Sequence, residues 1–379
     1  MRHIELDATE IERALDAWDK GTSGVGVLAL LPEAEKARLP LLQDACRLRG
    51  WSLAGAIFPA LINDRHFVTG GALLLFFERM PAHFLIPAVN AGPSAAVVRI
   101  AGEVRTRLPE LSPGAAKPTL FMLFDSMVPN IASILDGLYL ELANRVEYAG
   151  VNAGSETFQP MPCLFDANEV VGDGVLGLLL PGEFVPVMEH GFAQPERAMT
   201  ATSTQGNRIA MIDWRPAFDV YREIIRSEYG IDLNPENFYR YGVHFPFGIL
   251  RASGDVVVRI PVALSEDGAL YCVGEVPENT MLVLLKAPAA GANGCIERLG
   301  RRLRQEAGML PGDHLLTFYC AGRRMHLGET AEGELAELLT ATGARGLGGA
   351  LSLGEIGSTT RQGYPMFHNA TLVCATLPA

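Results

Sequence analysis

The chain has 379 residues, of which 49% are hydrophobic and 20% charged, and its formal net charge is −12. This length suits two domains of ordinary size, and the composition provides for packed cores and excludes a largely disordered chain. An acidic surface repels phosphate backbones, so nucleic acid is excluded as an expected partner.

Neither the N-terminal segment nor the apolar runs indicate a membrane segment. Residues 1–20 are charged and lack an apolar signal core, and the run at residues 72–77 is far shorter than the roughly 20 residues that cross a bilayer. The six cysteines are scattered and form no CxxC pair, which argues against a zinc ribbon or a dense disulfide framework. We therefore expect a soluble, cytoplasmic protein with reduced thiols and no membrane contact.

The first half alternates predicted strands and helices. Residues 8–19 are predicted as a helix, because Ile11, Leu15 and Trp18 recur at helical spacing. A second helix opens at Pro32, which suits a first helical turn, and ends at Gly50. Further helices are predicted at 94–108 and from a cap near Asn130 to 143, and strands at 25–31, 51–57, 72–77, 119–124 and 176–182.

A Pro/Gly-rich link is predicted at residues 109–118, and the polar stretch at 197–208 marks the expected domain boundary. The predicted class is α/β to α+β, with two layered domains of mixed sheets and flanking helices, residues 1–200 and 201–379. The second half is predicted to hold helices at 216–227, 293–305 and 329–342, and strands at 255–261, 270–273, 280–285, 314–319 and 370–376.

Common catalytic motifs are missing from the sequence. It has no GxxxxGK[ST] phosphate loop, no GxGxxG opening a helix, no GxSxG elbow and no HExxH zinc helix. Its eight histidines never pair at metal-ligand spacing, so the sequence indicates no catalytic dyad and no catalytic residue.

Two clusters lie in the first half. The Gly/Ser-rich run at 150–156 includes Asn152 and Ser155, and such a turn lets backbone N–H groups approach a ligand, although an ordinary tight turn explains it equally well. In Glu189-His190-Gly191-Phe192, His190 is a titrating, metal-competent side chain, while the simpler interpretation is a surface or satisfied interior histidine.

Two more clusters lie in the second half. The aromatic run at 241–249, which includes His244, suits a pocket wall, with core packing as the alternative. Near the C-terminus, Arg323 and Glu355 follow predicted strands, and with Asn369 they are predicted to converge on one small-ligand pocket. Arg323 would grip a carboxylate bidentately; a structural Arg–Glu bridge is equally compatible. Cys320, beside two arginines, is either a thiol of lowered pKa or a buried inert one.

The order and spacing of these clusters over residues 20–379 resemble the FIST family, with its N- and C-terminal domains. The matching segments are GAIFP at 55–59, residues 150–158, PCLF at 162–165, residues 200–207 and 212–217, FPFGI at 245–249, CAGR at 320–323, GEIG at 354–357 and HNAT at 368–371. The resemblance implies a bacterial-type sensory protein rather than an enzyme. It would bind a small molecule, with amino acids suggested for the family, and report to a separate protein such as a histidine kinase or a cyclic-di-GMP enzyme.

A subset of the family binds haem and senses nitric oxide, which makes haem b a possible cofactor. That subset often reads His-Gly-Trp where this chain has His190, Gly191 and Phe192, and residues 193–195 also depart from it. Should haem bind, His190 is the first expected axial ligand and His244 the second. The alternative from another class is an enzyme that uses Cys320 as nucleophile near Arg323 and Glu355.

Overall fold

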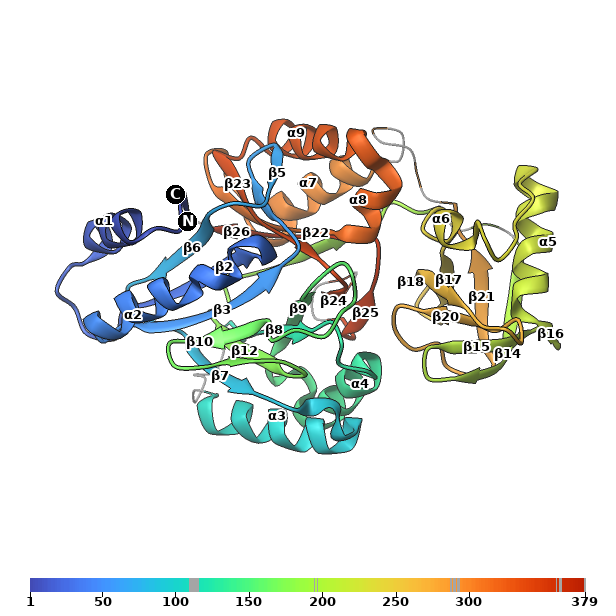
Figure 1. Ribbon diagram of the computed structural model, residues 1–379, viewed down its shortest axis with the longest axis horizontal. Coiled ribbons are helices and arrows are strands. Elements are labelled where there is room, and N and C mark those ends of the chain that lie inside the picture. Colours follow the sequence, from blue (N-terminus) through green and yellow to red (C-terminus); the bar gives the residue numbers. More distant parts are fainter. Residues whose placement is uncertain are drawn as a thin grey trace.

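The structure is a computed structural model that describes residues 1–108, 116–193, 195, 197–286, 288, 291, 294–358, 360 and 363–377. Within these residues, four sheets carry flanking helices, which is the α+β layering that the sequence predicts. Three six-stranded sheets form a body, and an antiparallel sheet with two helices stands beside it on the right of Figure 1. We call the second part, residues 197–286, the antiparallel unit.

Each sheet of the body contains one pair of parallel strands joined by a crossover that carries a helix, as parallel pairing requires. The strands of these pairs are buried almost throughout, so both faces of each sheet are covered. The pairs and their helices are β2 (Gly26–Pro32), α2 (Leu39–Arg49) and β3 (Ser52–Phe58); β8 (Thr119–Asp125), α4 (Ile131–Leu142) and β9 (Glu147–Ala153); and β22 (His314–Cys320), α9 (Ala331–Thr342) and β23 (Gly346–Ser352).

The remaining strands extend these pairs and form the antiparallel sheet. From edge to edge, the first sheet runs β1 (Arg2–Ile4), β6 (Ala72–Phe77), β2, β3, β10 (Leu164–Asp166), β11 (Val170–Val171). The second runs β25 (Met366–His368), β24 (Glu355–Gly357), β9, β8, β12 (Val175–Leu180), β7 (Ala82–Ile86). The third runs β13 (Val187–Glu189), β26 (Leu372–Leu377), β22, β23, β4 (Leu61–Asn63), β5 (His66–Val68). The antiparallel sheet runs β18 (Val256–Arg259), β17 (Phe247–Leu250), β21 (Thr280–Leu284), β14 (Ala198–Gln205), β15 (Arg208–Ile212), β20 (Leu270–Cys272), β19 (Pro261–Leu264), with β16 (Arg215–Pro216) on β15.

Helices cover the outer faces of the sheets (Figure 1). The amphipathic pattern of residues 8–19 does form a helix, α1 (Ala8–Trp18), and its buried side chains pack on the first sheet. The others are α3 (Pro93–Arg107), α5 (Ala217–Tyr229), α6 (Phe238–Gly242), α7 (Cys295–Glu306) and α8 (Ala321–Leu327), with short 3-10 turns at Glu33–Arg38, Val89–Ala91, Ala143–Arg145 and Gly328–Thr330. None of the described helices is long and apolar enough to cross a bilayer.

The three sheets of the body meet in one shared core. Phe58 of β3 lies 5.9 Å from Phe318 of β22, ring centre to ring centre, and Phe318 lies 5.7 Å from Phe121 of β8. All three rings are buried. One aromatic side chain from each parallel pair therefore joins the sheets at the centre of the body.

The two halves of the chain share sheets instead of forming separate ones. β4, β5 and β13 precede residue 200, yet they lie in the third sheet with β22, β23 and β26. Conversely, β24 pairs with β9 and carries β25 into the second sheet. The domain boundary expected between residues 200 and 201 stays a prediction. In the folded protein, strands from both sides of that position pair within the same sheets.

Two features differ from the sequence prediction. The polar stretch at 197–208, expected as the domain boundary, forms β14 and the turn into β15, with Met199, Ala201 and Thr202 buried. The helix expected from Pro32 is a 3-10 turn followed by α2, which ends, as predicted, at Gly50 with φ +65°. Most of the predicted link at 109–118 lies outside the described residues, as do Gln194 and Asn293.

The glycine-rich run at 150–156 is largely strand. A Cβ on Gly150 would lie 2.0 Å from the Met122 carbonyl oxygen, and one on Gly349 would lie 1.7 Å from that of Thr317. These glycines allow β9 and β23 to approach β8 and β22, their parallel neighbours. Both strands have few large apolar residues, so the hydrophobic periodicity of the sequence did not predict them. The turn begins only at Gly154.

Truncation after Gly363 tests the role of the final strand. It removes β25 and β26, and β26 lies between β13 and β22 within the third sheet. We expect loss of cooperative unfolding of at least the C-terminal half, because the deletion exposes a strand edge and an apolar face. The measurement is a thermal melt followed by circular dichroism, and a melting curve that matches the full chain would contradict this expectation.

Candidate functional site

Two adjoining pockets lie where parallel strands of the body end against the antiparallel unit. Strands β8, β9, β22 and β23 end in Asp125, Ala153, Cys320 and Ser352, and the residues next to these ends line the pockets. The carboxyl ends of parallel strands are a common place for ligands, because loops diverge there and leave an open crevice. Both pockets combine residues from the body with residues from the unit.

The first, which we call the apolar pocket, has an empty volume of about 540 Å³ that includes space open to solvent. The body contributes Cys320, Met325, Leu353 and Asn369, and the unit contributes Tyr239, Val243, Ile260 and Val262. A Cβ on Gly322 would lie 2.5 Å from Ile260 Cδ1, so glycine in the CAGR segment permits the close approach of unit and body.

Asn369 joins the two parts directly. Its Oδ1 accepts a hydrogen bond from the Ile260 N–H at 3.3 Å, and its Nδ2 donates to the His368 carbonyl at 3.0 Å. The Asn369 side chain is almost fully buried, and its two hydrogen bonds hold the wall of the apolar pocket in place.

The second, which we call the polar pocket, has an empty volume of about 970 Å³. Its lining includes Ser126, Asn130, Asn152, Glu275 and Phe367. Asn152 is 2% exposed, and neither its Oδ1 nor Ser126 Oγ has a hydrogen-bond partner among the described residues. Buried polar atoms nearly always have partners, so these two are candidates for contact with a ligand.

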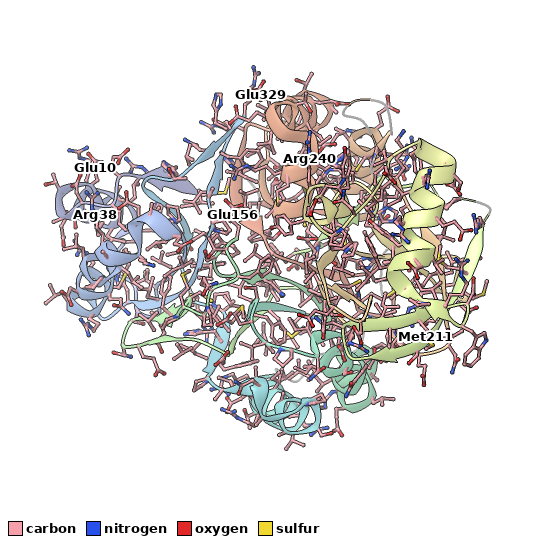
Figure 2. All side chains as sticks on the ribbon, turned by 45° about the vertical axis from the view of Figure 1, so that its right-hand side comes forward. Glu10, Arg38, Glu156, Met211, Arg240 and Glu329 are labelled. Carbon is pink, nitrogen blue, oxygen red and sulfur yellow. The ribbon has the colours of Figure 1, made fainter. Side chains whose placement is uncertain are left out.

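Phe158 stands between the pockets and lines both, together with Val262 and Val273. Its φ is +53°, a region that L side chains rarely adopt, and the turn holding it is fixed by Ser155. Ser155 Oγ lies 2.9 Å from Thr157 Oγ1, and the Ser155 carbonyl accepts the Phe158 N–H at 3.0 Å. Glu156, labelled in Figure 2, lies in this loop, and Arg240, also labelled there, lies in α6. Tyr239, the residue before Arg240, lines the apolar pocket.

A buried polar cluster lies beneath the apolar pocket. Glu355 accepts hydrogen bonds from Ser352 Oγ at 2.6 Å and from Thr371 Oγ1 at 2.7 Å. Burial raises the pKa of Glu355 to about 7, against the opposing effect of these hydrogen bonds. Across the strand pair lies His368, fully buried with both ring nitrogens unpartnered among the described residues. Glu355 and His368 are thus inside the body and not on a pocket wall.

The Cys320 thiol does not have the lowered pKa that its two neighbouring arginines suggest. Burial, and next the nearby Glu355, raise its pKa, because both disfavour the thiolate. Its Sγ accepts the Ala370 N–H at 3.1 Å. Cys320 therefore lacks the lowered thiol pKa that a nucleophile needs. Its side chain is a small residue in the wall of the apolar pocket.

Arg323 pairs with Glu334 and not with Glu355. Its Nε and Nη2 donate to the two Glu334 oxygens at 2.7 and 2.6 Å, and its Nη1 donates to the His190 carbonyl at 2.7 Å. Tyr319 also donates to Glu334. The guanidinium is occupied by the protein, so the structure favours the bridge alternative over a grip on a ligand carboxylate.

The histidines proposed for haem do not fit that cofactor. His190 Nδ1 accepts the Phe192 N–H at 2.9 Å, and burial lowers the pKa of His190 to about 4. The neutral ring then carries its proton on Nε2, the nitrogen that would have to bind iron, whereas an iron-bound histidine usually donates from Nδ1. His244 Nδ1 lies 2.5 Å from His326 Nδ1. Neither His190 nor His244 lines either pocket.

The structure thus sorts the predicted site residues into four groups. Cys320 and Asn369 line the apolar pocket, Asn152 lines the polar pocket, and Ser155 holds the Phe158 loop. Arg323, Glu355, His190 and His244 lie outside both linings. In the run at 241–249 the phenylalanines belong to the core of the antiparallel unit, and Val243 alone reaches a pocket. The described residues contain no group of three or more His, Cys, Asp or Glu suited to a metal ion.

Sequence reasoning missed Phe158, Val262, Ser126 and Glu275. The Gly/Ser-rich run pointed to the loop that carries Phe158, but Val262 and Glu275 stand in segments without any distinguishing pattern.

The site thus joins a mixed body to an antiparallel unit, and residues of both line its two pockets. A comparison with models of known families identifies the family of the chain. The FIST N domain matches residues 29–215 and the FIST C domain matches residues 217–358. The chain belongs to the FIST family, whose domains are generally sensory domains of signal transduction that bind small ligands. A comparison with curated proteins gives no match.

The buried pair gives a stability prediction. Arg323→Ala leaves Glu334 buried without its partner, and we expect a loss of about 3–5 kcal/mol in the free energy of unfolding. The matched control is Arg324→Ala, whose half-buried side chain rests over the Phe67 ring, with an expected loss of about 1 kcal/mol or less. Urea unfolding measures both, and equal losses would contradict a special role for the pair.

The thiols give a second prediction. All six cysteines are buried, and burial raises the Cys320 pKa. At neutral pH, iodoacetamide should therefore alkylate the folded protein on the order of 100-fold more slowly than the protein in denaturant. Mass spectrometry of the time course identifies the labelled site, and fast labelling of Cys320 in the folded state would restore the cysteine-dependent alternative.

Proposed function

We propose that this protein is a small-ligand sensor whose ligand binds in the cleft formed by the apolar and polar pockets. One observation carries the proposal: the cleft is lined by residues of both parts of the chain and contains buried polar atoms without partners among the described residues. Concave, mostly apolar sites with a few polar groups are the usual make-up of small-ligand sites.

The position of the cleft supports a sensory role. A ligand there touches the body through Leu353 and Met325 and the antiparallel unit through Val262. Its binding free energy therefore depends on how the unit sits against the body, so the ligand favours one arrangement of the two. A separate signalling protein, such as a histidine kinase or a cyclic-di-GMP enzyme, would respond to that arrangement.

The alternatives have less support from the geometry. A haem-based nitric-oxide sensor needs an axial histidine, and the proton position on His190 opposes that role. An enzyme that uses Cys320 needs a thiolate, which burial disfavours. The proposed function is thus binding without catalysis.

Val262→Trp tests the cleft. Val262 lines both pockets, and a larger side chain there should fill the space that a ligand needs. The protein is incubated with a bacterial metabolite extract, passed through a desalting column, and examined by native mass spectrometry for retained molecules.

We expect the wild type to retain a small molecule that Val262→Trp loses. The control is Val98→Trp on the outer face of α3, where Val98 is 69% exposed and the change should leave retention intact. Retention of the same molecule by all three proteins would place its site elsewhere, and no retention by the wild type would refute the proposal.

A further inference from the structure

The charges that line the cleft are of one sign. Among the described residues that line the two pockets, Glu156 and Glu275 carry charge, and both are acidic. A ligand carboxylate or phosphate would meet no lysine or arginine among the described residues of these walls. An anion that loses hydration in this cleft would gain no cationic partner from these walls, which makes its burial costly.

A buried cation that lies behind this wall is already used by the protein. Arg259 lines neither pocket; its guanidinium lies over the Phe367 ring, 5.4 Å from the ring centre. Its Nε donates to the Glu275 carbonyl at 2.8 Å and its Nη1 to the Phe367 carbonyl at 2.7 Å. Arg259 therefore supports the pocket wall from behind instead of offering a site for an anion.

The N-terminal turn of α4, which could otherwise attract an anion, is already occupied by an acidic side chain. This helix end borders the polar pocket through Asn130 and Ile131, and a helix N-terminus ordinarily attracts anions. Here the Glu275 carboxylate fills that position, accepting hydrogen bonds from the Ser133 N–H at 3.0 Å and from Ser133 Oγ. A second negative charge would be repelled by the first.

The same walls suit a positive group. The Asn152 Oδ1 and Ser126 Oγ have no hydrogen-bond partner among the described residues, and each can accept a hydrogen bond. Glu275 uses one hydrogen bond on each oxygen and retains further lone pairs. Phe158, Phe367 and Tyr239 add aromatic faces, which attract ammonium groups.

We propose that the cleft recognises an organic amine in its protonated form, with the ammonium in the polar pocket near Asn152, Ser126 and Glu275 and an apolar body in the apolar pocket. This inference rests on the proposed function and names the chemical class of its ligand. A free amino acid is disfavoured, because its carboxylate would have no positive partner among the described residues of these walls. Phe158 lies at the junction, where it contacts both ends of such a ligand.

The test uses probes that differ only in charge. The wild-type protein is titrated by isothermal calorimetry with phenethylamine and hexylamine, with the matched acids phenylpropionate and heptanoate, and with phenylalanine as the zwitterion. We expect at least one amine to bind roughly tenfold or more tightly than its matched acid and than phenylalanine. Binding of an acid or of phenylalanine as tightly as the amines, or no binding of either amine, overturns the proposal.

Variants then locate the ammonium. Glu275→Gln keeps an oxygen for Ser133 but removes the charge, and it should weaken the amine roughly tenfold. The matched control is Glu278→Gln on the same loop, where the side chain is exposed and lines neither pocket, and amine affinity should not change. Asn152→Leu, which removes both polar atoms at similar size, gives a second measure if Glu275→Gln fails to fold. An amine affinity that neither Glu275→Gln nor Asn152→Leu alters would contradict the assignment.

The two proposals fail in different ways. A metabolite whose retention is lost in Val262→Trp but that proves to be an acid or an amino acid would leave the cleft as the sensor site and refute the amine assignment. If the wild type retains no metabolite and binds none of the probes, both proposals fall.

Discussion

The contact of Phe58, Phe318 and Phe121 at the centre of the body is the interaction on which the rest of the arrangement depends. Each ring comes from a different sheet, and each lies on a strand of a parallel pair. Aromatic rings bury a large apolar surface, so their contact fixes how the three sheets face one another. Because these contacts hold β8 and β22, the segments that follow their carboxyl ends have fixed positions, and residues of those segments line the two pockets.

The sharing of sheets between the halves has a functional consequence. β4 pairs with β23, and β9 pairs with β24, so hydrogen-bond ladders join segments that are far apart in the chain. The sheets of the body therefore connect both halves of the chain, while the antiparallel unit contacts the body across the cleft. Glycine at position 322 and the Asn369 hydrogen bond to Ile260 bring the two into close contact at one side of the cleft. Under the proposed function, a ligand bound in the cleft would act on this contact without disturbing the sheets.

Charged and polar groups in this region separate into two kinds. Arg323 and Glu334 are both buried and satisfy one another, so they contribute to the fold and have little left for a ligand. Glu275 and Asn152 border the polar pocket and keep hydrogen-bonding capacity that the described residues do not use. The two kinds differ in whether the protein itself supplies hydrogen-bond partners, and not in residue type. An arginine and a glutamate near strand ends in the sequence do not reveal which partners they will have.

The sequence by itself determined the elements with a clear period and the family. The helical spacing of Ile11 and Leu15 and the apolar run of β6 are local patterns, and both elements formed where they were predicted. The ordered motifs indicated the family because order along the chain is also a property of the sequence. The tertiary structure alone decided which strands pair, that Arg323 meets Glu334, and that Phe158 and Glu275 face one cleft. These outcomes depend on close approaches between distant segments, such as Gly150 against Met122, and local patterns carry no information about such distances.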